Sequence, residues 1–221
     1  ERATRYLSSF RDRSVGESEL AKLKGYLQII EEEAFRCKHV TADILSLSQK
    51  DGLEITVIDL NRLMEAIFEF MNINKSIRVV RETDDSCPFI LGDINALRQV
   101  FVNLITNAVD AVEERMEATI WIRVKPVNGG DSSFVCVEIE DNGIGIPDAI
   151  VDKIFEPFYT TKESKKGIGL GLYLCYYFVT NMGGTLGVES KPGSGTTFSI
   201  LLPAKKKLEG GSDDDPHSYR R

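Results

Sequence analysis

Apolar and polar residues alternate along this chain with two different periods, and the change of period divides it into segments. Between residues 18 and 49 the apolar residues recur in steps of three and four, which predicts a helix with a coiled-coil seam. Residues 3–13 predict the end of a preceding helix, and the break at 14–16 makes the two helices an antiparallel hairpin. The exposed seam of such a hairpin favours pairing with a second copy; the alternative is a helical extension that folds against its own domain.

After residue 50 the pattern predicts a compact domain that begins near Glu54. Asp59 is a suitable N-cap for a helix with apolar positions from Leu60 to Met71, and residues 94–115 predict a second, longer helix. Alternating residues predict strands at 77–80, 119–127, 134–140, 185–190 and 196–202. The order of elements predicts an α+β fold, a two-layer sandwich whose antiparallel-rich sheet is covered by helices on one face, over residues 54–203.

Composition narrows the class of protein. The 221 residues are 42% hydrophobic and 28% charged, as in an ordinary soluble globular protein, and no apolar run reaches membrane-spanning length. The net charge of -7 argues against a nucleic-acid partner. Residues 204–221 are polar and rich in Gly, Ser and Asp, which predicts a disordered tail. Glu1 is not an initiator methionine, so we expect the chain to be part of a longer protein.

The cysteines are scattered and do not form a metal-binding pattern. They form no CxxC pair and have no histidine at ligand spacing, so a zinc site is not expected. We expect reduced, buried thiols in a cytoplasmic protein, at positions Cys37, Cys87, Cys136 and Cys175.

Glycine clusters dominate the stretch from Asp141 to Leu172. Glycine allows backbone N–H groups to approach a ligand closely, and the cluster that ends at Gly171 leads directly into an apolar helical pattern. Free N–H groups at a helix start form a natural cradle for phosphate. Asp141 ends an alternating run, so its carboxylate is expected at a strand end beside the first cluster, which contains Gly143 and Gly145.

Asn103 and Asn107 lie four residues apart, so both amides project from one face of the predicted long helix. An amide oxygen is a neutral, hard ligand that suits a Mg²⁺ ion carrying nucleotide phosphates, whereas a carboxylate there would repel those phosphates. The simpler interpretation is a polar helix face. Asparagine is a poor helix former, and two of them within an apolar stripe favour a role in binding.

These residues resemble the motifs of sensor histidine kinases. Residues 103–108 resemble their N box, 141–145 the G1 box, 155–162 the F box, 167–172 the G2 box and 193–196 the last glycine box, all in the family's order. The resemblance covers about residues 54–203. It implies the Bergerat-type ATP-binding fold that these kinases share with gyrase-type, heat-shock chaperone and mismatch-repair ATPases.

The resemblance also implies roles for individual residues. Asp141 would accept the adenine amino group, assisted through water by Thr196, while Asn103 would hold Mg²⁺ with support from Asn107. Lys162 would contact the γ-phosphate from a lid over residues 159–168 that orders when ATP binds. The backbone around the second glycine cluster would cradle the phosphates. The ATP-binding set that the resemblance implies is completed by Gly143, Gly145, Ile146, Phe158, Gly167, Gly169, Leu170, Gly171 and Leu172.

Residues 1–50 then resemble part of the kinases' dimerisation and phosphoacceptor hairpin, which implies a homodimer and docking of a response regulator receiver domain. The acceptor histidine of the family lies on the first helix and is followed by an acidic residue. Here His39 falls on the second helix and is followed by Val40, and His217 lies in the tail. We therefore expect His39 to be a surface residue and the acceptor to lie upstream of Glu1.

The function implied is transfer of the γ-phosphoryl group of Mg-ATP to a histidine, for relay to an aspartate of a response regulator, in the cytoplasm and with any membrane anchor upstream. One alternative is a regulatory module that binds ATP without kinase activity. Another is a Ser/Thr kinase of the anti-sigma type, although those kinases lack the long hairpin. A gyrase or chaperone type ATPase would need a transducer domain, and only a polar tail follows here.

Overall fold

The computed structural model describes residues 18–27, 29–30, 34, 41, 53–71, 73–84, 89–129, 132–161 and 168–204. The chain divides into two compact units, Glu1–Lys50 and Asp51–Arg221. In the first unit every described residue is helical, in agreement with the predicted helix from residue 18 onward. The rest of the predicted hairpin lies outside the described residues, as do Cys37, His39, Cys87 and the tail after Ala204.

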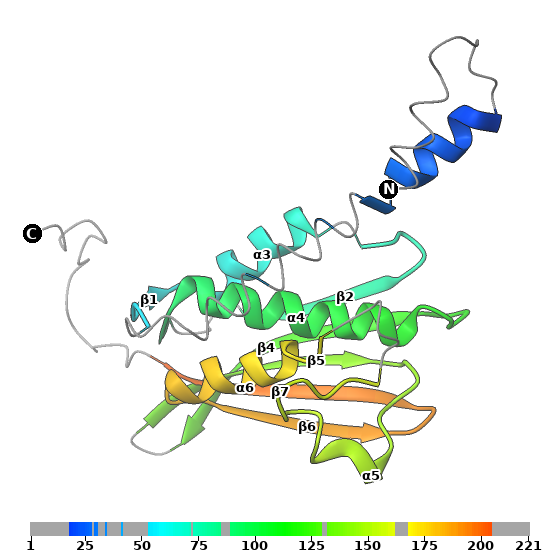
Figure 1. Cartoon of the computed structure of the whole chain (residues 1–221). Helices are drawn as coiled ribbons and strands as arrows, with labels where there is room; N and C mark the ends of the chain where they lie inside the picture. Colours follow the sequence, from blue (N-terminus) through cyan, green and yellow to red (C-terminus); the bar gives the residue numbers. More distant parts are fainter. Residues whose placement is uncertain are drawn as a thin grey trace, which may run out of the picture. The chain divides into compact units, whose positions relative to one another are not determined.

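A five-stranded sheet forms the centre of the second unit. Its strands are β2 (Arg78–Thr83), β4 (Thr119–Gly129), β5 (Ser132–Asp141), β6 (Thr185–Lys191) and β7 (Gly195–Pro203). Their spatial order is β2-β4-β5-β7-β6, and every pair is antiparallel except β2 with β4, which is parallel. The predicted antiparallel-rich sheet is confirmed, and Figure 1 shows the helices α4 and α6 lying along it.

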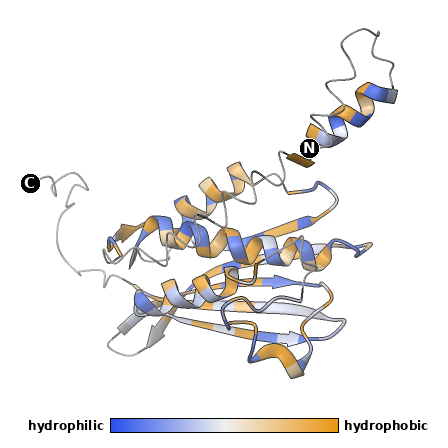
Figure 2. Ribbon diagram, viewed as in Figure 1, coloured by the Kyte–Doolittle hydropathy of each residue, from blue (hydrophilic) through white to orange (hydrophobic). Residues whose placement is uncertain are grey.

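The helices are α3 (Leu60–Phe70), α4 (Ile94–Val112), α5 (Asp148–Val151) and α6 (Gly171–Asn181). Asp59 caps α3 as predicted, because its carboxylate accepts a hydrogen bond from the Arg62 N–H at 3.1 Å. Asp93 caps α4 in the same way. Orange and blue bands alternate along α4 in Figure 2, and its apolar residues, Phe101 and Leu104 among them, are fully buried against the sheet and α6. Of the helices in the described part of the chain, none combines the length and apolarity needed to cross a bilayer.

The predicted end of α4 was three residues too late. The helix ends at Val112, and the following residues form a turn in which the Arg115 N–H donates to the Val112 carbonyl. A second difference is a small sheet of β1 (Thr56–Ile58) and β3 (Ile90–Gly92), which the pattern did not predict because three-residue strands show too little alternation. After the sheet, Ala204 still belongs to the fold, since it bridges to Ile90.

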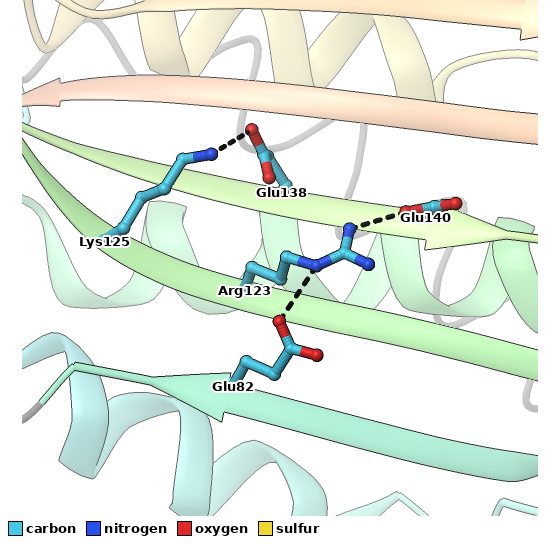
Figure 3. Close-up of polar contacts among 5 residues, drawn as sticks. All are labelled: Glu82, Arg123, Lys125, Glu138 and Glu140. Atoms are coloured by element: carbon cyan, nitrogen blue, oxygen red, sulfur yellow. Dashed lines mark hydrogen bonds and ion pairs between the residues drawn. The ribbon is translucent and has the colours of Figure 1, made fainter.

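The face of the sheet away from the helices carries a set of ion pairs (Figure 3). Arg123 on β4 contacts both Glu82 on β2, at 3.0 Å, and Glu140 on β5, at 2.5 Å, and Lys125 contacts Glu138 at 2.7 Å. The hydrogen bond to Glu140 is the main cause that raises the pKa of Arg123. These pairs keep the open face polar, as expected for an antiparallel sheet with one solvated side.

Cys136 lies on this open face between the buried residues Val135 and Val137, and its thiol is only partly buried. The prediction of a buried thiol is therefore wrong for Cys136, because the alternation along β5 turns it outward. It is confirmed for Cys175, which is buried on α6 and unbridged.

Candidate functional site

Asp141 is the last residue of β5 and one of two buried residues with polar side chains among those the structure describes. Its side-chain oxygen Oδ1 accepts a hydrogen bond from the Gly143 N–H at 2.8 Å. The other buried polar residue, Thr196, is its direct partner on β7. Burial raises the pKa of Asp141, and hydrogen bonds from the backbone N–H groups of Gly143 and Thr196 oppose part of that rise. The acidic group lies at the strand end, as predicted, and the structure shows in addition that it is largely desolvated.

The loop after Asp141 is fixed to the neighbouring elements by many short bonds. Asn142 is tied to the start of β4, where its Oδ1 accepts from the Thr119 N–H at 2.9 Å. The Ile144 N–H donates to the carbonyl of Ala111 near the end of α4 at 3.1 Å, and the Ile146 N–H donates to Ser190 Oγ on β6 at 2.7 Å. This loop, residues 142–146, is consequently held on three sides before any ligand binds.

The glycines of this region are needed for close packing of backbone against backbone. Gly145 has a φ of 70°, and a Cβ there would lie 2.2 Å from the Lys191 carbonyl oxygen. At Gly195, with a φ of 120°, a Cβ would lie 1.9 Å from the carbonyl oxygen of Asp141. A side chain at either position would push the turn between β6 and β7 away from the end of β5. Glycine is therefore required at these two positions by backbone packing alone, in addition to any contact with a ligand.

Asn103 and Asn107 project from α4 and are both partly buried. Asn103 Nδ2 donates to the carbonyl oxygen of Gly171, the first residue of α6, at 3.3 Å. A Cβ on Gly171 would come within 3.6 Å of the Asn103 amide, so this glycine lies directly over it. The structure therefore brings the first predicted asparagine to the start of the second glycine motif.

The start of α6 has no side-chain cap among the described residues, which leaves its first N–H groups directed out of the helix. Leu170 at the N-cap is buried, whereas Gly171 and Leu172 are partly exposed. Gly169 has a φ of 76°, and its carbonyl accepts from the Phe158 N–H at 2.9 Å. An uncapped helix start next to an asparagine amide is the kind of place where phosphate groups bind.

The segment around Phe158, just before the predicted lid, approaches this helix start. Phe158 has a φ of 66°, which is unusual for a residue other than glycine, and the residue is 68% exposed. Ile144, at the other end of the site, is also largely exposed. Lys162 and Gly167 lie outside the described residues, with most of the predicted lid.

Two residues with a part in this arrangement were not predicted from the sequence. Arg115, after α4, donates from Nη2 to the carbonyls of Gly143 and Gly193, both at 2.7 Å. Ser190 on β6 accepts from the Ile146 N–H and lies 2.9 Å from Thr196 Oγ1. Neither belongs to a glycine or asparagine motif, and only their positions in the fold connect them to Asp141.

Comparison with known proteins agrees with this geometry. Residues 92–206 match the family described as histidine kinase-, DNA gyrase B-, and HSP90-like ATPases. The chain belongs to this family of ATPases, which supports ATP as the nucleotide that the domain binds.

Similar proteins are sensor kinases. The chain is 33% identical over 198 residues to the sensor kinase CckA of Brucella abortus, a match that covers 85% of this chain and 21% of that protein. It is 34% identical over 206 residues to sporulation kinase A of Bacillus subtilis, with 84% and 32% covered. The chain thus spans about a fifth to a third of the length of these two relatives.

Among solved structures, the catalytic domain of histidine kinase ThkA is similar with a TM-score of 0.59 and 29% identity. The match covers 69% of this chain and 99% of that one. This agreement over a whole catalytic domain confirms the predicted α+β sandwich as the histidine kinase ATPase fold.

Proposed function

We propose that this chain is the catalytic region of a sensor histidine kinase, which binds Mg-ATP and transfers the γ-phosphoryl group to a histidine. The observation that carries the proposal is the buried carboxylate of Asp141, set between the N–H of Gly143 and its strand partner Thr196. An ionised carboxylate can accept about four hydrogen bonds. Two backbone donors leave room for the amino group of adenine, with Thr196 beside it to hold a bridging water.

The opposite end of the site supports binding of the phosphates. The uncapped N–H groups of Gly169, Leu170, Gly171 and Leu172 would cradle them, and Ile146 and Phe158 would line the space between the two ends. Gly143 and Gly145 shape the adenine end. We assign Lys162 to the γ-phosphate and place Gly167 in the same lid.

The donor set fits a magnesium ion. The Asn103 amide uses its nitrogen to bind the Gly171 carbonyl, so its oxygen is the end available to a cation, and Asn107 lies one turn further along α4. We propose these two residues as the protein's contribution to the metal site, with phosphates and water as the other ligands. When bound, Mg²⁺ neutralises charge on the transferring phosphoryl group.

We further propose that the phosphoryl group passes from the histidine to an aspartate of a response regulator. The structure of histidine kinase ThkA in complex with the response regulator protein TrrA is similar to this chain, with a TM-score of 0.67 and 26% identity. That match covers 92% of this chain and 57% of that one. Residues 1–50 are the proposed docking and homodimer surface, and the reaction belongs in the cytoplasm, where ATP is available.

The experiment is a labelling assay with γ-labelled ATP and Mg²⁺, on this chain and on a longer version extended upstream. We expect the longer version to acquire acid-labile, base-stable phosphate and its Asp141→Asn variant to stay unlabelled. Labelling of the short chain that His39→Gln abolishes would make His39 the acceptor. Binding of ATP without labelling of either version would favour the regulatory module instead.

A further inference from the structure

Arg115 joins three segments that are distant in the sequence. It follows the last turn of α4, and its Nη2 nitrogen donates to the carbonyl oxygen of Gly143 in the loop after β5. The same nitrogen donates to the carbonyl oxygen of Gly193, in the turn between β6 and β7, and both distances are 2.7 Å. One guanidinium group therefore fastens the loop 142–146 to the turn 192–194.

Both of these segments surround Asp141. The N–H of Gly143 is a hydrogen-bond donor to the Asp141 carboxylate, and Gly195, which directly follows the turn 192–194 as the first residue of β7, packs on the Asp141 carbonyl. The two segments also bind each other, since the Gly193 N–H donates to the Ile144 carbonyl at 2.7 Å. Arg115 adds hydrogen bonds to both segments from the end of α4. A shift of Gly143 would break its hydrogen bond to Arg115.

The charge of Arg115 also acts on Asp141. Burial is the main cause that raises the pKa of Asp141, the neighbouring Glu140 raises it further, and the Arg115 guanidinium lowers it. Glu140 itself points to the open face of the sheet, where Arg123 neutralises it. Arg115 is thus the cation that opposes the effect of burial on the acid at the proposed adenine end.

We propose that Arg115 is a positioning residue for nucleotide binding, which holds the loop 142–146 and the turn 192–194 together and so sets Asp141 and the Gly143 N–H in place for adenine. This inference rests on the proposed ATP site and adds a residue to it. Arg115 makes no contact with the nucleotide in this proposal; it acts through the two loops.

The test compares ADP affinity over a range of pH for the unaltered chain, Arg115→Met, Arg115→Lys and the control Arg62→Met. Arg62 is an exposed arginine on α3 that pairs only with Asp59 at the cap of its own helix among the contacts described. Arg115→Met removes two charge-assisted hydrogen bonds that hold the loop 142–146 and the turn 192–194. We expect the affinity for ADP to fall about tenfold at neutral pH as a result. As the pH is lowered, Arg115→Met should also lose ADP binding at a higher pH than the unaltered chain does. Without the nearby cation the pKa of Asp141 is higher, so its carboxylate is protonated earlier.

The lysine variant separates charge from mere packing. A lysine ammonium carries three donors and keeps the positive charge, so Arg115→Lys should bind ADP more tightly than Arg115→Met. On acidification, Arg115→Lys should lose binding at the same pH as the unaltered chain. A purely structural arginine would lower affinity equally at every pH, and that result would overturn the inference. So would an Arg115→Met variant that binds like Arg62→Met.

A measurement without nucleotide keeps the inference separate from the proposed function. The carboxyl carbon of Asp141, followed by NMR during an acid titration, should titrate at higher pH in Arg115→Met than in the unaltered chain. If the unaltered chain binds no ADP, the proposed ATP site fails, while an unchanged titration of Asp141 would overturn the role of Arg115. If Arg115→Met does not fold, Arg115→Gln provides the same comparison.

Discussion

Asn103 Nδ2 donates to the carbonyl oxygen of Gly171 at 3.3 Å, which joins the middle of α4 to the first residue of α6. The bond orients the amide so that its nitrogen faces protein and its oxygen faces away. The same bond ties the carbonyl of the first residue of α6 to α4. One side chain thereby connects the proposed metal site with the proposed phosphate cradle.

We predict that Asn103→Asp weakens ATP binding by at least about tenfold, because the carboxylate cannot donate to Gly171 and repels the phosphates. The affinity for adenosine, which has no phosphate, should fall much less. Calorimetric titration with ATP, ADP and adenosine measures this difference. Asn181→Asp is the matched control, since Asn181 also donates from its amide to a carbonyl, that of Tyr177, at the far end of α6. Equal losses for adenosine and ATP would contradict the phosphate assignment.

We predict that Asp141→Asn loses nucleotide affinity about ten- to a hundredfold but makes the nucleotide-free protein more stable near neutral pH. Burial raises the pKa of Asp141 in the folded state, so its contribution to stability is greatest below its unfolded pKa and is lost as the pH rises through the folded pKa. Asparagine does not ionise and avoids that loss.

Thermal unfolding at neutral pH and at a pH below the ordinary aspartate value measures the difference in stability. The gain in Tm for Asp141→Asn should be present at neutral pH and absent in acid. Asp148→Asn, at an exposed position at the start of α5, should show neither effect. A variant that is less stable than the unaltered chain at neutral pH would show that the carboxylate is well solvated.

Much of this fold follows from periodicity and from local chemistry. The cap at Asp59, the long helix after Asp93 and the two hairpins each depend on residues within a few positions of one another, and their ends were predicted to within about three residues. Asp141 was placed at the end of a strand by alternation alone. Asn103 and Asn107 were placed on one helix face by spacing.

The remaining features depend on contacts between distant parts of the chain. Arg115 donates to backbone carbonyls 28 and 78 residues away in the sequence. Every residue has such a carbonyl, so residue types alone do not predict which ones accept this bond. Ser190 lies beside Thr196 only because β6 pairs with β7 in one register. The small sheet of β1 and β3 pairs Thr56 with Gly92 and Ile58 with Ile90, residues that are far apart in the sequence, and each strand is too short to show a period.

We predict that Gly145→Ala destabilises the fold by about 3 kcal/mol, since it combines a positive φ with a backbone clash. The added Cβ would lie 2.2 Å from the carbonyl oxygen of Lys191, the last residue of β6, so the turn that follows β6 would have to shift. Gly187→Ala is the control, because the nearest atom to its Cβ would be Ser199 O at 3.9 Å, and its change should stay within about 1 kcal/mol. Urea unfolding measures both variants, and similar values for the two would mean that the loop and the turn are further apart than the structure shows.

We predict that Arg123→Met costs less than about 1 kcal/mol of stability and leaves ATP affinity unchanged. Arg123 contacts Glu82 and Glu140, yet the side chains of these acids are 57% and 36% exposed, so water and salt screen both pairs. A double-mutant cycle with Glu82→Gln, measured by urea unfolding at low and high salt, isolates the pair, whose coupling should fall as salt is added. The open face of the sheet lies opposite the side on which Asp141 is buried, and a large loss of ATP affinity in Arg123→Met would show that the two faces are coupled through β5.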